Sequence, residues 1–306
     1  MKPHVAISIG DLNGVGIELA LRKHKKIKEW CKPIYCINKE MLSQASALLN
    51  LKIPTDFKLF ATKGEFVIEP GIVDAKAGQY SFDSFNDAIK LTEDGITKAM
   101  VTLPINKEAW SKAGIDFKGH TEVLRKHFKK DAIMMLGCSK MFVALYTEHM
   151  ALKNVAKQFN LKQLTQFLLD FHKCIHPKSK VAVLGLNPHA SDNGVLGNEE
   201  ELIIQAVNQV NKKLKKEVFT QPMVPDTAFT KFNRKNHTYY IAMYHDQGLI
   251  PLKALYFEQS INVSLNLPVI RTSVDHGTAF DIAYKKQANA KSYLNAIKEA
   301  VRLTHK

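Results

Sequence analysis

Three histidines follow short apolar runs of the sequence and are candidates for binding a metal ion. His149 lies in YTEHM, His189 in LNPHA and His245 in MYHDQG, each one or two residues beyond its run. Imidazoles suit Zn²⁺, Co²⁺ or a related ion, and three of them leave a position open for a substrate oxygen. A single histidine at a strand end is more often structural, and none here belongs to a compact motif such as HExxH. Their equivalent positions predict a catalytic divalent-metal site.

A second set of residues has the chemistry of an anion-binding site. Arginine binds phosphate or carboxylate through two hydrogen bonds, and lysine supplies a point charge. Each residue alone would more often be an ordinary surface residue, but these lie beside turns and buried strands. The set comprises the motif GHTE (119–122), Lys253, Asn262 and Arg271, with Thr272 and Ser273 beside the arginine.

The segment GDLNGVGIE, residues 10–18, is a glycine-rich turn between a predicted strand and a predicted helix. It does not match the dinucleotide-binding fingerprint GxGxxG, because Leu19 occupies the position of the third glycine. A ligand contact and a tight turn in which Asp11 or Asn13 caps the next helix are both consistent with the pattern.

Eight short apolar runs bounded by turn residues predict buried strands that would position these side chains. They cover residues 4–10, 33–38, 99–104, 132–137, 141–147, 181–187, 239–244 and 261–268. Segments with helical periodicity lie between several of them, at 84–98, 161–173, 199–216 and 291–303. This alternation predicts an α/β fold. In open α/β sheets ligands bind at the carboxyl ends of strands, where the candidate residues fall.

The composition is that of a globular protein. Of the 306 residues, 45% are hydrophobic and 24% charged, and the formal net charge is +14. This length favours one large α/β unit or two domains that share a cleft. Lysines and arginines are scattered over presumed helix faces without interleaved aromatic residues, so we do not expect nucleic-acid binding. A solvated basic surface and attraction of an anionic substrate both explain the charge.

The cysteines and the N-terminal residues bear on where the protein works. The four cysteines form no CxxC pair, and the chain opens on a strand-like run rather than a signal sequence. No stretch approaches the roughly 18 apolar residues that a membrane span needs. We therefore expect reduced thiols, a cytoplasmic location and no membrane association.

Eight motifs agree in order and spacing with one known family. They are GDLNGVGIE (10–18), TLPINK (102–107), GHTE (119–122), TEHMAL (147–152), GLNPHASDNG (185–194), PDTAF (225–229), YHDQGLIPLK (244–253) and INVSLNLPVIRTSVDHGTAFDIA (261–283). Over nearly its whole length the chain resembles the 4-hydroxythreonine-4-phosphate dehydrogenase family of pyridoxal phosphate synthesis. Two departures concern local loop shape: Leu12-Asn13 replaces a common Pro-Ala, and Leu103 replaces a small residue before Pro104.

The resemblance implies a fold and an assembly. We expect a two-domain α/β subunit related to isocitrate and isopropylmalate dehydrogenases, with the active site in the interdomain cleft at the interface of a homodimer. The first domain would comprise 1–125 and 275–306, and the second, with the metal site and dimer interface, 126–274. The subunits would share their active sites, with His245 facing His149 and His189 of the partner subunit. The absence of GxGxxG is then expected.

The resemblance also assigns roles to individual residues. The cation-binding positions match His149, His189 and His245. The substrate-binding positions match His120, Thr121, Lys253, Asn262 and Arg271. His276, Gly277 and Thr278 are similar to the loop that receives the adenosine of the dinucleotide in the wider group of decarboxylating dehydrogenases.

The expected reaction oxidises a small phosphorylated hydroxy amino acid, 4-phosphooxy-L-threonine, with NAD or NADP and Zn²⁺, Mg²⁺ or Co²⁺. The product, 2-amino-3-oxo-4-phosphooxybutanoate, decarboxylates to 3-amino-2-oxopropyl phosphate. The metal would lower the pKa of the substrate alcohol. Asp226 and Asp246 are candidates for the general base or for a partner that orients a ligating imidazole. Lys253 would help to fix the reacting carbon against the nicotinamide.

Three other functions are also consistent with the sequence. A dehydrogenase of a phosphorylated sugar acid, such as threonate or erythronate 4-phosphate, would have the same metal site. A phosphate acyltransferase would share a related fold but needs neither nicotinamide nor the three histidines. A binding protein for phosphorylated metabolites would show no turnover.

Overall fold

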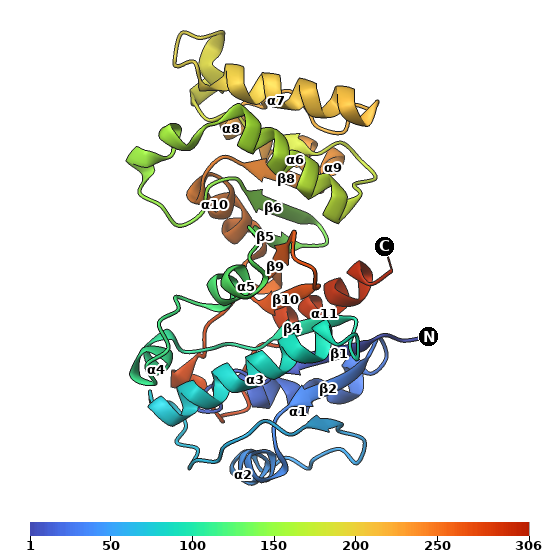
Figure 1. Ribbon diagram of the computed structural model, residues 1–306, viewed down its shortest axis with the longest axis vertical. Helices are drawn as coiled ribbons and strands as arrows, with labels where there is room; N and C mark the ends of the chain where they lie inside the picture. The colour runs from blue at the N-terminus through green and yellow to red at the C-terminus, as the bar shows by residue number, and fades with distance from the viewer. Residues whose placement is uncertain (306) are drawn as a thin grey trace. The chain divides into compact units, whose positions relative to one another are not determined.

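The computed structural model describes residues 1–305 and groups them into two α/β units (Figure 1). Unit 1 comprises Met1–Ala132 and the chain from Ile261 onward, and unit 2 comprises Ile133–Ser260. The expected division placed 126–274 in the second domain. In the structure, the last two strands of the chain belong instead to unit 1, together with the N-terminal strands.

Unit 1 is built on a mostly parallel sheet in the order β3-β2-β1-β4-β10-β9. Strand β1 pairs in parallel with β2 and β4, and β10 pairs in parallel with β4 but antiparallel with β9. The carboxyl ends of β1, β4 and β10 therefore meet at one edge. The strands are β1 (His4–Ser8), β2 (Lys32–Cys36), β3 (Leu59–Phe60), β4 (Ala99–Thr102), β9 (Ile261–Leu265) and β10 (Arg271–Val274).

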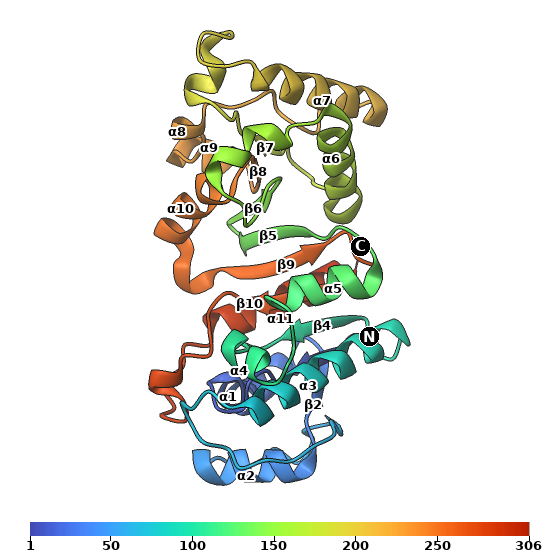
Figure 2. The same ribbon diagram turned by 60° about the vertical axis from the view of Figure 1, so that its left-hand side comes forward.

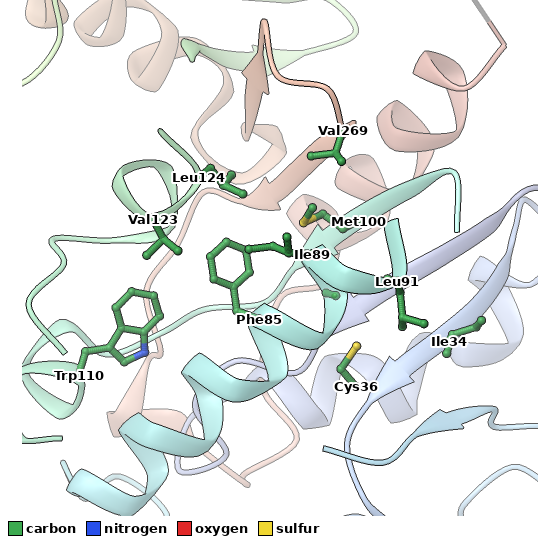
Figure 3. Close-up of a cluster of buried hydrophobic side chains, with 12 residues drawn as sticks. Ile34, Cys36, Phe85, Ile89, Leu91, Met100, Trp110, Val123, Leu124 and Val269 are labelled. Atoms are coloured by element: carbon green, nitrogen blue, oxygen red, sulfur yellow. The ribbon is translucent and has the colours of Figure 1, made fainter. Parts of the chain in front are cut away.

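Helices cover both faces of the unit 1 sheet. Successive side chains of a strand point to opposite faces, so strands whose residues are nearly all buried need a helix layer on each side. Ala6, Ile34 and Met100 are in register and pack with α3 (Figure 3). On the other face, Thr272 donates a hydrogen bond to the carbonyl of Ala296 in α11. The helices are α1 (Gly16–Ile27), α2 (Lys39–Leu49), α3 (Ala75–Glu93), α4 (Lys107–Lys112), α5 (His120–Phe128) and α11 (Lys291–Leu303), with the 3₁₀ helix η5 (Phe280–Ile282).

Unit 2 has strands in the order β5-β6-β8-β7, with β5 and β6 antiparallel and β6, β8 and β7 parallel. Helix α10 packs on one side of β5, β6 and β8, and α6 and α7 pack together on the other (Figure 2). The strands are β5 (Ile133–Cys138), β6 (Met141–Leu145), β7 (Ala182–Val183) and β8 (Tyr239–Ala242). The helices are α6 (Leu161–Ile175), α7 (Glu199–Leu214), α8 (Pro225–Ala228), α9 (Lys231–Asn236) and α10 (His245–Tyr256). The 3₁₀ helices are η1 (Leu152–Asn154), η2 (Ala156–Gln158), η3 (Pro188–Asp192) and η4 (Phe257–Gln259).

The predicted elements are present. Each of the eight apolar runs contains a strand, and the four periodic segments correspond to α3, α6, α7 and α11. Helix α3 begins at Ala75 rather than at residue 84. Strand β10, with the sequence RTSV, was not predicted because it is polar, although all four of its residues are buried. A search for apolar runs misses such a strand, since its burial depends on neighbouring elements.

The cysteines agree with the expectation of reduced thiols. Cys31, Cys36, Cys138 and Cys174 are all free thiols. Within residues 1–305, no helix is both long enough and apolar enough to cross a membrane.

Candidate active site

The three predicted metal-binding histidines lie in unit 2, beyond strands that run in the same direction. His149 lies in the loop after β6, His189 lies in η3 beyond β7, and His245 is the first residue of α10 after β8. Because β6, β8 and β7 are parallel neighbours, their carboxyl ends meet at one edge. The three segments that carry the histidines therefore all begin at the carboxyl-terminal edge of the unit 2 strands, as the sequence pattern predicted.

His149 and His245 come together within one chain, with their ring centres 5.4 Å apart. Two imidazoles that bind one ion through nitrogens about 2.0–2.1 Å from it have ring centres roughly 5 Å apart. The pair therefore fits a divalent cation. This pairing differs from the expectation that His245 faces His149 of the partner subunit, since the two rings are neighbours in the same chain.

The orientation of the His245 ring also suits a metal ligand. Its Nδ1 lies 2.7 Å from Oδ1 of Asp246. An ionised carboxylate only accepts hydrogen bonds, so Nδ1 donates and Nε2 keeps its lone pair for a metal. Of the two roles considered for Asp246, this contact favours the orientation of a ligating imidazole.

His189 lies in a segment of unusual backbone conformation. Five consecutive residues without glycine, 189–193, have positive φ. Such conformations cost of order 1–3 kcal/mol each and are concentrated at functional sites. Within residues 1–305, no three His, Cys, Asp or Glu side chains gather closely enough in one chain to hold a metal ion. His189 is therefore not grouped with the other two histidines. Asp226 lies nearby in α8, which packs against η3.

Unit 1 contains a buried cation at the start of β10. Arg271 is 2% exposed and donates to Thr102 Oγ1 from Nε (3.2 Å) and Nη2 (2.8 Å), and to Ser264 Oγ from Nη1 (3.1 Å). Both acceptors are neutral hydroxyls, and within residues 1–305 no carboxylate pairs with this guanidinium. Burial lowers the pKa of Arg271 to about 9. A buried charge without a counterion favours the binding of an anion.

His120 begins α5 and packs its ring on an apolar cluster of unit 1. The ring centre lies 4.5 Å from that of Phe85 and 5.7 Å from that of Trp110, both in edge-on contact. Figure 3 shows these two side chains with Val123 and Leu124 of α5. Burial, and next the charge of Arg271, hold the pKa of His120 well below its usual range. The imidazole is therefore neutral at physiological pH.

Two buried polar atoms of the predicted substrate set have no partner within residues 1–305. They are Nε2 of His120 and Oδ1 of Asn262. Unpartnered buried polar atoms are rare in native proteins, so a ligand is a reasonable partner for them. Thr121 follows His120 in the first turn of α5, where backbone N–H groups favour an anion.

Lys253 is the member of the predicted substrate set that belongs to unit 2. It lies two turns beyond His245 in α10, and its Nζ is 5.3 Å from the ring centre of Phe257. The other four members belong to unit 1.

The predicted cofactor loop packs directly against the glycine-rich loop. Val15 N donates to the carbonyl of Thr278 (3.0 Å), and a Cβ at Gly14 would lie 2.8 Å from that same oxygen. Gly14 thus allows the two backbones to approach closely. His276 Nε2 is buried without a partner within residues 1–305, while Gly277 has open space beside it.

The capping role considered for the glycine-rich loop is wrong. Helix α1 follows Val15 without a side-chain cap. Asn13 instead accepts from Glu69 N (2.9 Å) and donates to the carbonyl of Ile72 (2.8 Å), while Asp11 accepts from Asn13 N (2.9 Å). Asn13 therefore joins its loop to the neighbouring segment 69–72, and Asp11 stabilises the turn within its own loop, so neither side chain caps the helix.

Several residues that shape these sites were not identified from the sequence. Thr102 and Ser264 hold the guanidinium of Arg271, and Glu200 accepts from the backbone N–H groups of Leu186 (2.8 Å) and Asn187 (2.6 Å) ahead of His189. Thr102 lies in the motif TLPINK, but Glu200 lies in an acidic run that is typical of a solvated helix end. Their roles depend on contacts between segments far apart in the sequence.

Comparisons with known proteins show which proteins this chain is similar to. Residues 29–300 match the model of the family described as pyridoxal phosphate biosynthetic protein PdxA. A relative from Sulfurimonas denitrificans named 4-hydroxythreonine-4-phosphate dehydrogenase is 60% identical over 99% of this chain and 98% of its own. A crystal structure of a protein of that name from Burkholderia phymatum has a TM-score of 0.83 at 29% identity, covering 99% and 98% of the two chains. An isocitrate dehydrogenase from Methylococcus capsulatus shares only the fold, at 12% identity and a TM-score of 0.51, covering 100% of this chain and 88% of its own.

Proposed function

Because the chain belongs to the family of the pyridoxal phosphate biosynthetic protein PdxA, we propose that it oxidises 4-phosphooxy-L-threonine with NAD or NADP and a divalent metal ion. The product would be 2-amino-3-oxo-4-phosphooxybutanoate, which decarboxylates to 3-amino-2-oxopropyl phosphate. The observation that carries the metal-dependent part is the His149–His245 pair, with its ring centres 5.4 Å apart and His245 held by Asp246.

Different residues of the chain would bind the cation, the substrate and the dinucleotide in this reaction. His149, His189 and His245 would hold the cation, and Asp246 would keep the Nε2 of His245 available to it. Arg271, with neutral His120, Thr121, Asn262 and Lys253, would bind the phosphate and carboxylate. Asp226, beside η3, is our candidate for the base that takes the alcohol proton. When bound, the cation supplies Lewis-acid polarisation of the alcohol and the nicotinamide accepts the hydride. The loop of His276, Gly277 and Thr278 would contact the dinucleotide.

We also propose that two copies of the chain complete each metal site. His149 and His245 are supplied by one chain, and His189, which is not grouped with them, would be supplied by the other. The helix that carries His245 supports this proposal, because α10 and η4 expose Ile250 (66%) and Phe257 (65%). Exposed apolar side chains of this size on one helical segment are typical of an interface.

The test is an assay of the purified protein with each candidate substrate. With Co²⁺ and either NAD⁺ or NADP⁺, addition of 4-phosphooxy-L-threonine should produce the absorbance of the reduced cofactor, and a chelator should abolish it. Turnover of threonate 4-phosphate alone would indicate the sugar-acid dehydrogenase. Absence of reduced cofactor with every substrate, or full activity in rigorously metal-free protein, would contradict the proposal.

A further inference from the structure

The side chain of Gln247 joins two segments that carry candidate metal ligands. Gln247 lies in the first turn of α10, where its Oε1 accepts from Met243 N (2.8 Å) and its Nε2 donates to the carbonyl of Gly185 (2.7 Å). Met243 lies between β8 and His245, and Gly185 lies between β7 and His189. One amide therefore ties the end of β8 to the segment that leads to His189.

The third histidine segment is tied to the same point. The carbonyl of Met243 accepts from Oγ1 of Thr147 (2.7 Å), which lies two residues before His149. Met243 and Thr147 are both buried, so these bonds are shielded from water. The three segments that carry His149, His189 and His245 are thus linked through the backbone of Met243 and the side chain of Gln247.

The segment that carries His189 needs such an anchor because its backbone is strained. Positive φ at residues 189–193 persists only where surrounding contacts hold it. On the side that precedes the strain, those contacts include the bond from Gln247 to Gly185, the bond from Gly185 N to the Met223 carbonyl, and the bonds that Glu200 accepts from Leu186 and Asn187. Glu200 belongs to α7, whereas Gln247 belongs to the helix that begins with His245. The contact of Gln247 therefore connects the segment before His189 to the helix that carries His245.

We propose that Gln247 is a positioning residue that fixes the loop of His189 against the strand ends of its own chain, so that each chain presents His189 to one shared metal site and His149 with His245 to the other in fixed positions. The proposal rests on the proposed function, in which these histidines bind the metal. The role needs an acceptor and a donor on one side chain, which an amide provides. Glutamate keeps the acceptor but places a negative oxygen against the Gly185 carbonyl, and methionine removes both groups at similar size.

Two variants, Gln247→Glu and Gln247→Met, test the proposal on the full-length protein freed of metal. Amide hydrogen exchange in segment 185–190 should be faster than in the wild type, because the anchor of the loop is lost. Titration with Co²⁺ should show an affinity roughly 10- to 100-fold weaker, the range typical of lost outer contacts to a metal site. The visible absorption of the bound Co²⁺ should shift, since the ligand geometry changes.

Asn211→Asp provides a matched control in the same unit. The Asn211 amide also bridges backbone groups, accepting from Val218 N and Phe219 N (both 3.0 Å) and donating to the Phe219 carbonyl (2.8 Å). Its change should lower the melting temperature but leave Co²⁺ affinity and absorption unaltered. If it shifts them as much as the Gln247 variants do, the effect is general destabilisation and the proposal is wrong.

Histidine variants separate failure of this proposal from failure of the proposed function. If His149→Ala and His245→Ala lose Co²⁺ while both Gln247 variants bind it normally and exchange slowly, the positioning role is refuted and the metal site stands. If the two histidine variants bind Co²⁺ as the wild type does, the metal site itself is refuted, and the role of Gln247 with it.

Discussion

Arg271 brings a positive charge into the interior of unit 1, where only the hydroxyls of Thr102 and Ser264 contact it. Such a charge is costly to bury, and an anionic ligand would offset part of that cost. His120 nearby is held neutral by burial and by the same positive charge, so it does not add to the repulsion. At the scale of single residues, the site of unit 1 therefore combines one fixed cation with neutral hydrogen-bonding groups.

Replacing this arginine with lysine should weaken substrate binding. In Arg271→Lys the charge remains but the planar fork held by two hydroxyls is lost, so KM should rise roughly 10- to 100-fold, as for a lost charge-assisted hydrogen bond. Steady-state kinetics would measure the change, with Arg302→Lys on the surface as control. A dephosphorylated substrate should be much less sensitive to the substitution. Equal sensitivity with and without the phosphate would show that Arg271 binds another group.

Asp11 gives a pH-dependent contribution to stability that can be isolated. It is fully buried, and burial raises its pKa from 3.8 to about 6. As pH rises above 3.8, Asp11 ionises in the unfolded chain but stays protonated in the folded protein, so the unfolded state binds fewer protons. The contribution of Asp11 to the free energy of unfolding therefore falls until about pH 6 and is constant at higher pH. The total loss is of order 3 kcal/mol.

Asp11→Asn should remove this dependence while keeping the acceptor for Asn13 N. Denaturant unfolding of variant and wild type at several pH values would test it. The difference between the two free energies should grow in favour of the variant between pH 4 and 6, and then level off. A difference that is independent of pH would show that Asp11 keeps its ordinary pKa in the folded protein.

At the scale of elements, α3 and α4 approach each other at a glycine. A Cβ at Gly78 would lie 2.2 Å from the carbonyl oxygen of Ala109 and 3.0 Å from Trp110 N. These are backbone atoms, so they cannot move aside as a flexible side chain would. Trp110 in turn contacts the ring of His120, which connects this helix contact to the candidate substrate site.

Gly78→Ala should therefore destabilise the protein by about 1–3 kcal/mol. An alanine in a helix interior ordinarily stabilises by roughly 0.5–1 kcal/mol, so the expected sign is reversed. Thermal unfolding would measure the change, and the exposed neighbour substitution Gln79→Ala should have little effect. Near-ultraviolet circular dichroism should report movement of Trp110. A stabilised Gly78→Ala variant would show that α3 and α4 separate easily.

At the scale of the whole molecule, the proposed sharing of histidines between two copies can be tested by mixing inactive variants. The subunits of His189→Ala and His245→Ala, allowed to exchange, would form dimers in which one site has both lesions and the other has none. With random exchange half of the dimers are mixed, so activity should recover to roughly a quarter of the wild type.

A second mixture is the control for the first. His149 and His245 are neighbours in one chain, so a mixture of His149→Ala and His245→Ala should leave a lesion in every site and remain inactive. Recovery in this second mixture would show that these two histidines come from different subunits. No recovery in the first, with exchange confirmed by mass spectrometry, would place His189 with the other two.

The sequence by itself determined the class of fold, the approximate positions of eight strands and the family. Apolar runs bounded by turn residues are local signals, so all eight predicted strands are present, and parallel strands bring His149, His189 and His245 to one edge. The motifs that resemble the 4-hydroxythreonine-4-phosphate dehydrogenase family are likewise read from neighbouring residues, and the family match agrees with them.

Tertiary structure alone decided which of these side chains meet and what surrounds them. Three features depend on contacts between segments far apart in the chain. They are the pairing of His149 with His245, the burial of the polar strand β10 with Arg271, and the hydrogen bonds by which Asn13 joins two loops instead of capping a helix. Periodicity reports which residues share a face of one element, but it contains no information on the partner across a sheet edge or loop. That partner is set by packing, and packing also decides whether a charge such as that of Arg271 lies in water or in the interior.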